Sequence, residues 1–293
     1  LLDWLAAQLV SHEFDERHIV RLITTSAAYQ REPAPVDLAS LDATSRFFSS
    51  PGRRRLSAEQ IIDSLHTAAG RTIDSEELTF VYDGSHPLGR RQTLGVPERA
   101  WMFASLNNER DRPSLALPRA QTTVDVLEAF GWNGSRQMPI FDRATDPNVL
   151  QPGILANGLL VQNLSRASHQ SELADLAVTS ESAGSLLQTL FLRFLTRPPT
   201  AAEREAFLPS IEKGFDDRIV PETQRIEPSE PEPLGLATWP NHVSPEANTI
   251  QLEVEKRVRS GPLPDPRLET EWREIYEDVI WSLINDREFV WIP

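Results

Sequence analysis

The stretch AGSLLQTLFLRFLTRPPT, residues 183–200, has the strongest hydrophobic periodicity in the chain. Its apolar residues recur at intervals of three and four, the spacing that places side chains on one face of an α-helix. That face consists of Ala183, Leu186, Leu187, Leu190, Phe191, Phe194 and Leu195. Because Pro198-Pro199 ends the pattern, the sequence predicts a buried helix over residues 183–195.

The same spacing predicts further helices on both sides of this stretch. Thr200 and Glu203 form a capping box that opens the next helix, in which Pro209 is expected to produce a bend or a stop. A final amphipathic helix has on one face Trp272, Ile275, Tyr276, Val279, Ile280, Leu283 and Ile284. Other helices are expected at about residues 1–10, 15–30, 57–69, 120–130, 147–163 and 244–260.

Residues 76–106 depart from the helical pattern. Leu78, Phe80 and Tyr82 alternate with more polar neighbours as far as a turn dipeptide, and Trp101 and Phe103 lie in a second short apolar run. Alternation of this kind is typical of strands, so we expect a small β-hairpin element here.

The predicted fold is therefore mainly α: an irregular multi-helix domain with a small β-hairpin and a long proline-rich arm. Residues 1–219 are expected to form a helical core that includes the β element at about 76–106. Residues 220–243 are proline-rich, acidic and without periodicity, which is typical of an extended arm. Residues 244–293 are expected to form a C-terminal helical pair that packs back on the core.

The composition excludes several classes of function. The chain has 293 residues, a net charge of −14 and no cysteine. The absence of cysteine excludes disulfides, zinc–thiolate sites and covalently attached haem c within this chain. An acidic chain without a basic stripe argues against nucleic-acid binding. No apolar run approaches the roughly 20 residues of a membrane helix, and the histidines lack metal-binding spacing, so we expect no membrane span and no metal.

The stretch NNERDRPSLALPR, residues 107–119, concentrates charged and amide side chains between two prolines. It could form a polar groove that recognises a carboxylate or a sugar, with a nearby tryptophan stacking on a carbohydrate ring. Alternatively, Glu109 and Asp111 neutralise the arginines and fasten the loop to the helical body, and we favour this structural role. The candidate ligand-binding residues are Asn107, Asn108, Arg110, Arg112, Arg119 and Trp132.

A second basic feature, Arg53-Arg54-Arg55, directly precedes the helix that Ser57 and Gln60 open as a capping box. Arginines beside a helix N-terminus favour anions, so these three are candidate anion-binding residues. The structural alternative, which we favour, pairs them with nearby carboxylates such as Glu59 or Asp63.

Several segments together resemble the family of unknown function DUF1553. They include LLDWLA at 1–6, RLITTS at 21–26, RRLSAEQ at 54–60 and residues 107–119. They continue with LANG at 155–158, LTRPPT at 195–200 and DVIWSLIN at 278–285. The similar segments occur in the same order along nearly the whole chain.

This resemblance implies a context and assigns no catalytic residues. Such domains are typical of planctomycetes and usually lie C-terminally in exported proteins, downstream of a cytochrome-c-like domain and a sister domain. We therefore expect an exported interaction or scaffold module whose partners are the upstream domains of the same polypeptide. Any haem c would belong to an upstream domain, and no cofactor is expected in this chain.

Two alternatives remain from the sequence. The first is a module that binds a glycan or a carboxylate through residues 107–119. The second is a hydrolase of polysaccharide-related substrates that uses Glu109 and Asp111. The hydrolase is the weakest hypothesis because the adjacent arginines would keep both carboxylates ionised.

Overall fold

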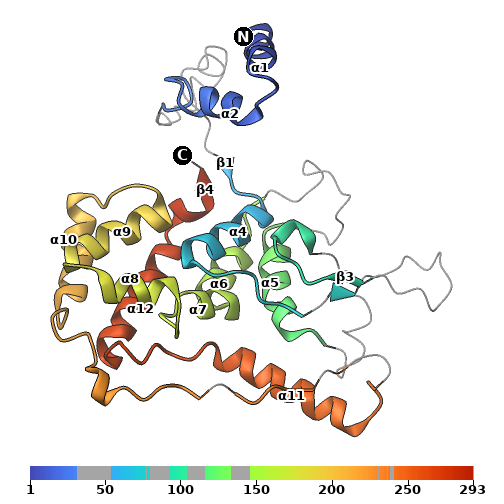
Figure 1. Cartoon of the computed structure of the whole chain (residues 1–293), viewed down its shortest axis with the longest axis vertical. Coiled ribbons are helices and arrows are strands. Elements are labelled where there is room, and N and C mark those ends of the chain that lie inside the picture. Colours follow the sequence, from blue (N-terminus) through green and yellow to red (C-terminus); the bar gives the residue numbers. More distant parts are fainter. Residues whose placement is uncertain are drawn as a thin grey trace. The chain divides into compact units, whose positions relative to one another are not determined.

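The fold is mainly α-helical, as the sequence predicts (Figure 1). The structure is a computed structural model of the whole chain. It describes residues 1–31, 54–76, 78–79, 93–103, 116–132, 146–229, 231–235, 237 and 241–292.

The chain divides into two compact units. Unit 1 comprises residues 1–55 and 291–293, and unit 2 comprises residues 56–290. The boundaries expected from the sequence, at 219/220 and 243/244, stay a prediction. Unit 1 contains helices α1 (Leu2–Ser11) and α2 (Glu16–Thr24), with strands β1 (Arg54–Arg55) and β4 (Trp291–Ile292).

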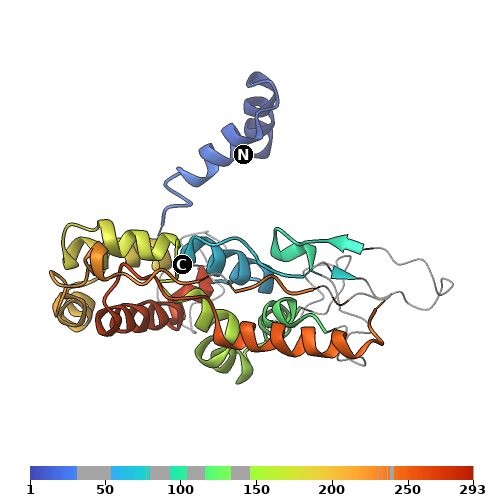
Figure 2. The same ribbon diagram turned by 60° about the horizontal axis from the view of Figure 1, so that its bottom comes forward.

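Unit 2 contains the other helices. In chain order they are α4 (Ala58–Ala69), η1 (Ala100–Met102), α5 (Pro118–Ala129), α6 (Leu150–Asn157), α7 (Leu159–Leu164), α8 (Glu172–Thr179), α9 (Ala183–Leu195), α10 (Ala201–Glu212), η4 (Glu222–Gln224), α11 (Pro245–Ser260), α12 (Thr270–Ile284) and η5 (Arg287–Val290). In both views α9, α10 and α12 lie together at one end of this unit. Figure 2 shows α11, in orange, passing below α5, in green.

The caps predicted from the sequence are present. Ser57 and Gln60 form a capping box at the start of α4, and Thr200 and Glu203 form another at the start of α10. Gly70 ends α4 in the left-handed conformation at φ 65°, which glycine adopts without steric cost.

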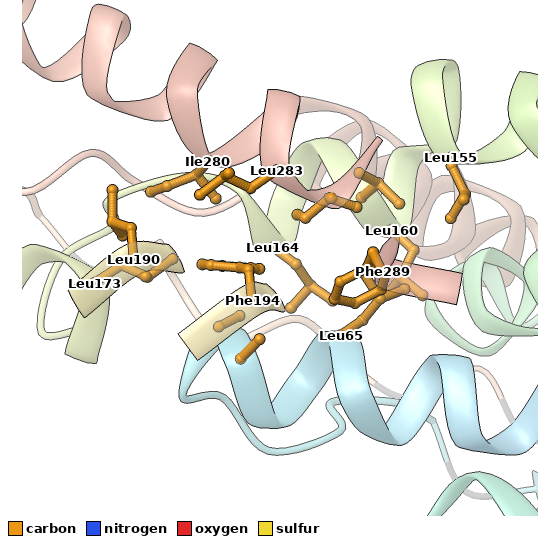
Figure 3. Close-up of a cluster of buried hydrophobic side chains, with 14 of the residues drawn as sticks. Leu65, Leu155, Leu160, Leu164, Leu173, Leu190, Phe194, Ile280, Leu283 and Phe289 are labelled. Atoms are coloured by element: carbon orange, nitrogen blue, oxygen red, sulfur yellow. The ribbon is translucent and has the colours of Figure 1, made fainter. Parts of the chain in front are cut away.

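Two predicted stripes form the centre of the core. Leu190 of α9 and Ile280 of α12 are both fully buried. Figure 3 shows them in a cluster with Leu65 of α4, Leu164 of α7 and Phe289 of η5. Helices that are far apart in the sequence therefore contribute their apolar faces to one core.

Polar atoms of aromatic residues within this core have hydrogen-bond partners. The Tyr276 hydroxyl donates to the Leu173 carbonyl at 3.0 Å, and the Trp272 Nε1–H donates to the Ile211 carbonyl at 2.9 Å. The two rings stack with their centroids 5.3 Å apart. These bonds offset the cost of burying the two polar groups.

Two pairs of short strands are present among the described residues. In unit 2, β2 (Leu78–Thr79) and β3 (Thr93–Gly95) pair antiparallel within the region where the sequence predicts a β-hairpin. The second apolar run is not a strand, because Trp101 lies in the 3₁₀ turn η1. Phe80 and Tyr82 lie outside the described residues. In unit 1, β1 pairs antiparallel with β4, a pairing that sequence analysis did not predict.

Two further expectations need correction. Pro209 does not stop α10, which continues to Glu212; the Lys213 N–H donates to the Pro209 carbonyl at 3.2 Å, so the bonding pattern resumes after the proline. The helix expected at 147–163 is two helices, separated at Gly158. A Cβ atom at Gly158 would collide with the Ile154 carbonyl oxygen, so a side chain does not fit at this sharp turn.

Candidate interaction surface

Most of the ligand-binding residues predicted from the sequence lie outside the described residues. These are Asn107, Asn108, Arg110 and Arg112, together with the neighbouring carboxylates Glu109 and Asp111. Arg53 is also outside. Their roles stay predictions.

Arg119 lies in the first turn of α5 and is engaged with residues 74–76. Its backbone N–H and that of Ala120 donate to the Glu76 carboxylate at 3.1 and 2.9 Å. Its guanidinium contacts the Asp74 carboxylate, with Nη1 and Oδ1 3.2 Å apart. A carboxylate that accepts N–H groups at a helix N-terminus stabilises the helix. Arg119 thus helps to fasten the start of α5 to the segment after α4.

Trp132 belongs to the core cluster of unit 2, and only 5% of its surface is exposed. Its backbone N–H donates to the Leu127 carbonyl at 3.0 Å. In this structure the indole is not available to stack on a sugar ring.

Arg54 and Arg55 form strand β1 and pair with Ile292 and Trp291. At the start of α4, the capping box already uses two of the backbone donors that would attract an anion, because Gln60 N–H donates to Ser57 Oγ and Ser57 N–H donates to Gln60 Oε1. Arg54 and Arg55, two of the three candidate anion-binding residues, therefore lie in a strand, and the helix that follows them has a capped N-terminus.

Asp265, which is 1% exposed, is the centre of a polar cluster in unit 2. It accepts hydrogen bonds from the Arg267 guanidinium at 2.9 and 2.8 Å and from the Gln170 N–H at 3.3 Å. Burial would raise the pKa of Asp265, but the hydrogen bonds, chiefly from Arg267, outweigh it and lower the pKa. Arg267 also contacts Asp175 of α8 at 2.7 Å. The cluster connects the loop before α12 to the start of α8, which is a structural role.

Arg197 connects the end of α9 to two other elements. Its Nη1 and Nη2 contact the two Glu203 oxygens at 2.8 and 2.7 Å, and its Nε contacts Glu288 at 2.7 Å. The hydrogen bonds from Arg197 lower the pKa of Glu203 to about 2. This planar, bidentate pairing suits arginine and joins α9, α10 and η5.

The α1–α2 pair of unit 1 has the opposite character, because its apolar side chains are exposed. Asp3 is the only charged residue in α1, and apolar residues surround the helix. A helix that is apolar on all sides is normally buried, yet neither α1 nor α2 has a buried residue. The large exposed apolar residues of this pair, here named together the α1–α2 apolar surface, are Leu1, Leu2, Trp4, Val10, Phe14, Val20, Ile23 and Tyr29.

The connection between these helices has unusual backbone geometry. Glu13 and Phe14 have φ values of 55° and 63°, the left-handed region that costs a non-glycine residue roughly 1–2 kcal/mol. In this conformation the Phe14 side chain is 68% exposed. The two helices contact each other, and the rings of His12 and His18 stack at 3.7 Å.

Sequence analysis predicted both helices but did not identify this surface. The signal that could have revealed the surface is the near absence of charge around the whole first helix.

The described residues contain neither a metal-binding cluster nor a membrane-spanning helix. In those ranges, no group of three or more His, Cys, Asp or Glu side chains is arranged to hold a metal ion. None of the helices in the described part of the chain is long and apolar enough to cross a bilayer.

Comparison with known proteins gives one match. The profile of the family described as "Protein of unknown function (DUF1553)" matches residues 1–211. Searches among curated proteins and among solved structures each found no match. The matched residues include the α1–α2 pair and most of the helices of unit 2.

Proposed function

The chain belongs to the DUF1553 family of proteins of unknown function, and we propose that it is a non-catalytic interaction module of an exported multidomain protein. The proposed partner is an upstream domain of the same polypeptide, associated with a cytochrome-c-like domain that carries any haem. The proposed export and the proposed upstream partner both rest on the resemblance to the DUF1553 family.

The α1–α2 apolar surface is the observation that carries this proposal. Exposed side chains such as Trp4 (51%), Phe14 (68%) and Val20 (59%) are costly in water and favourable in a protein interface. Tryptophan and phenylalanine are also enriched at interfaces. The strained backbone at Phe14 adds to this argument, because strain is typically retained where it supports a function.

Two carboxylates of unit 2, those of Asp265 and Glu203, have structural roles. The Asp265 and Glu203 carboxylates are both hydrogen-bonded to arginines, which keeps them ionised and engaged within the protein. A general acid needs a raised pKa, whereas the pKa of each of these two groups is lowered.

The two alternatives have less support from the described residues. The proposed glycan site would use Trp132, which is buried. The proposed hydrolase would use Glu109 and Asp111, which lie outside the described ranges.

The test is a binding measurement between this chain and the separately produced segment that precedes it in the intact protein. We expect Trp4→Glu and Phe14→Glu each to weaken binding by about ten-fold or more, because a charge in an apolar interface is desolvated without a partner. Leu252→Glu is the matched control, since Leu252 is 68% exposed on α11 in unit 2.

Unchanged affinity in both unit 1 variants would contradict the proposal. Loss of self-association in the same variants, without any binding of the upstream segment, would instead identify a second copy of the chain as the partner. Circular dichroism of each variant checks that the helical fold is retained.

A further inference from the structure

A groove lies between α5 and α6 in unit 2, and it contains no residue of the α1–α2 apolar surface. Its volume is about 460 Å³, within the range of roughly 300–1,000 Å³ that is usual for ligand sites. Asp125 and Glu128 line it from α5, and Leu150, Gly153, Ile154 and Asn157 line it from α6. None of these residues belongs to the sites predicted from the sequence.

The α5 side of the groove is acidic. Asp125 and Glu128 are three residues apart, so they project from the same helical face. The Asp125 carboxylate accepts a hydrogen bond from the Gln121 amide at 2.6 Å, which fixes its position at the edge of the groove. Glu128 already has an interaction partner, so the acidic character of this edge rests on Asp125, and the described lining residues include no lysine, arginine or histidine.

The α6 side is apolar and open. Leu150 is 64% exposed and the adjoining Val149 is 86% exposed, which is unusual for large aliphatic side chains. At Gly153, a Cβ atom would meet no other atom within 4 Å, so the space above this residue is empty. Gly158, where a side chain would collide with the Ile154 carbonyl, also lines the groove.

We propose that the α5–α6 groove binds a basic amphipathic peptide segment of another protein. An apolar side chain of that segment would pack on Leu150 and Ile154, and a lysine or arginine would pair with Asp125 at the edge. Charge complementarity carries this choice, because an acidic edge beside an apolar floor fits a helix with apolar and basic faces. A second copy of this chain fits less well, because two chains of net charge −14 repel each other.

The probe is a fluorescently labelled synthetic peptide of about four helical turns, with leucine on one face and lysine on the other. A peptide with glutamate in place of lysine is its charge-reversed counterpart. We expect the lysine peptide to bind the intact chain and the glutamate peptide to bind much more weakly. Failure of the lysine peptide to bind at about 1 mM would overturn the proposal.

Variants at Gly153 then locate the binding. Gly153→Phe should fill the groove and weaken binding by about ten-fold. Gly153→Ala should leave affinity within about two-fold, because its methyl group meets open space and alanine favours the helix. Equal affinity in the Phe variant and the unmodified chain would place the peptide elsewhere and sink the proposal. If the Phe variant does not fold, Leu150→Arg provides the same test by placing a positive charge in the floor.

Charge variants separate the groove from general attraction to an acidic protein. Asp125→Asn should weaken binding, whereas Asp278→Asn, at an exposed carboxylate on α12, should not. Equal losses in these two variants would indicate unspecific attraction and contradict the proposal.

Trp4→Glu should leave peptide binding unchanged. Failure of the peptide to bind is therefore distinguishable from failure of the function proposed for the α1–α2 apolar surface.

Discussion

Arg218 shows how a single residue can hold a helix end in place. It is 7% exposed, and its guanidinium donates to the carbonyls of Phe215, Ala177 and Ser180 at 2.7, 2.8 and 2.8 Å. Two of these carbonyls belong to the last turn of α8 and its cap, where a cation is favourable. Burial lowers the pKa of Arg218 below its usual value, although arginine stays charged.

We predict that Arg218→Ala destabilises unit 2 by about 2–4 kcal/mol, because the buried carbonyls would lose a charged donor. Urea unfolding followed by circular dichroism measures the change. Arg259→Ala is the control, because the Arg259 side chain is 66% exposed on α11. A loss of less than about 0.5 kcal/mol for Arg218→Ala would show that these bonds add little to stability.

Glu203 provides a pH-dependent prediction at the same scale. Its folded pKa of about 2 lies below the ordinary value of 4.5, chiefly because Arg197 donates to it. A lowered folded pKa contributes stability above about pH 4.5, and this contribution is lost as the pH falls towards 2. Because a quarter of the side chain is exposed, solvent screening reduces the contribution to about 1–2 kcal/mol.

The measurement is the unfolding free energy between about pH 6 and pH 2 for the original chain and for Glu203→Gln. The difference between the two proteins should shrink as the pH falls, since both then lack the ionised carboxylate. Glu205→Gln, at an exposed position of the same helix, controls for the removal of one negative charge. A difference that stays constant with pH would refute this assignment.

At the scale of the element, α9 and α12 show why helical periodicity identifies core residues well. Both helices begin at side-chain caps, at Ser182 and Glu269, and both bury the face that the three-four spacing defines. Residues outside these stripes, such as Arg193 and Glu274, form ion pairs nearer the surface. The face predicted from the spacing is the face that is buried, because each of these helices packs a single apolar face against the core.

For these helices we predict that Leu190→Ala or Ile280→Ala costs roughly 2–5 kcal/mol, through lost burial and the cavity that remains. Leu192→Ala is a control on the same helix as Leu190, because Leu192 is 46% exposed. Thermal unfolding of the three variants gives the comparison. Equal losses at positions 190 and 192 would show that burial does not explain the effect.

At the scale of the whole molecule, the core cluster lies entirely within unit 2. Helices α1 and α2 contribute no buried residue, so their removal takes no side chain out of that core. The stability of unit 2 should therefore depend little on the first part of the chain.

We predict that a fragment comprising residues 54–293 folds and unfolds cooperatively, with a midpoint within a few degrees of the intact chain. It should also lose binding of the upstream segment while retaining binding of the lysine peptide at the α5–α6 groove. A fragment that is unfolded by circular dichroism would show that the two units depend on each other. Deletion of residues 291–293 alone should expose the amide of Arg54 to hydrogen exchange, because β1 would lose the antiparallel partner towards which this N–H points.

Local signals in the sequence determined most helices, their caps and the stripes at 183–195 and 272–284. Periodicity and capping act within a few residues, so they can be recognised without knowing the fold. There are two exceptions: Pro209 was expected to bend or stop a helix that continues to Glu212, and Gly158 divides a helix that was expected to be continuous. In both cases the backbone hydrogen bonds around the residue decided whether the helix continues, and the residue type alone does not predict them.

Only the tertiary structure decided which distant segments meet. The pairing of β1 with β4, the burial of Trp132, and the groove formed by Asp125 on α5 with Leu150 on α6 all depend on how the helices pack. The residue type alone does not determine whether a side chain faces a core, a partner or solvent, because this depends on which segments from elsewhere in the chain pack against it. The exposed apolar residues of α1 and α2 are the clearest case: their spacing predicts helices, and only the arrangement of unit 1 shows that their apolar side chains are left uncovered.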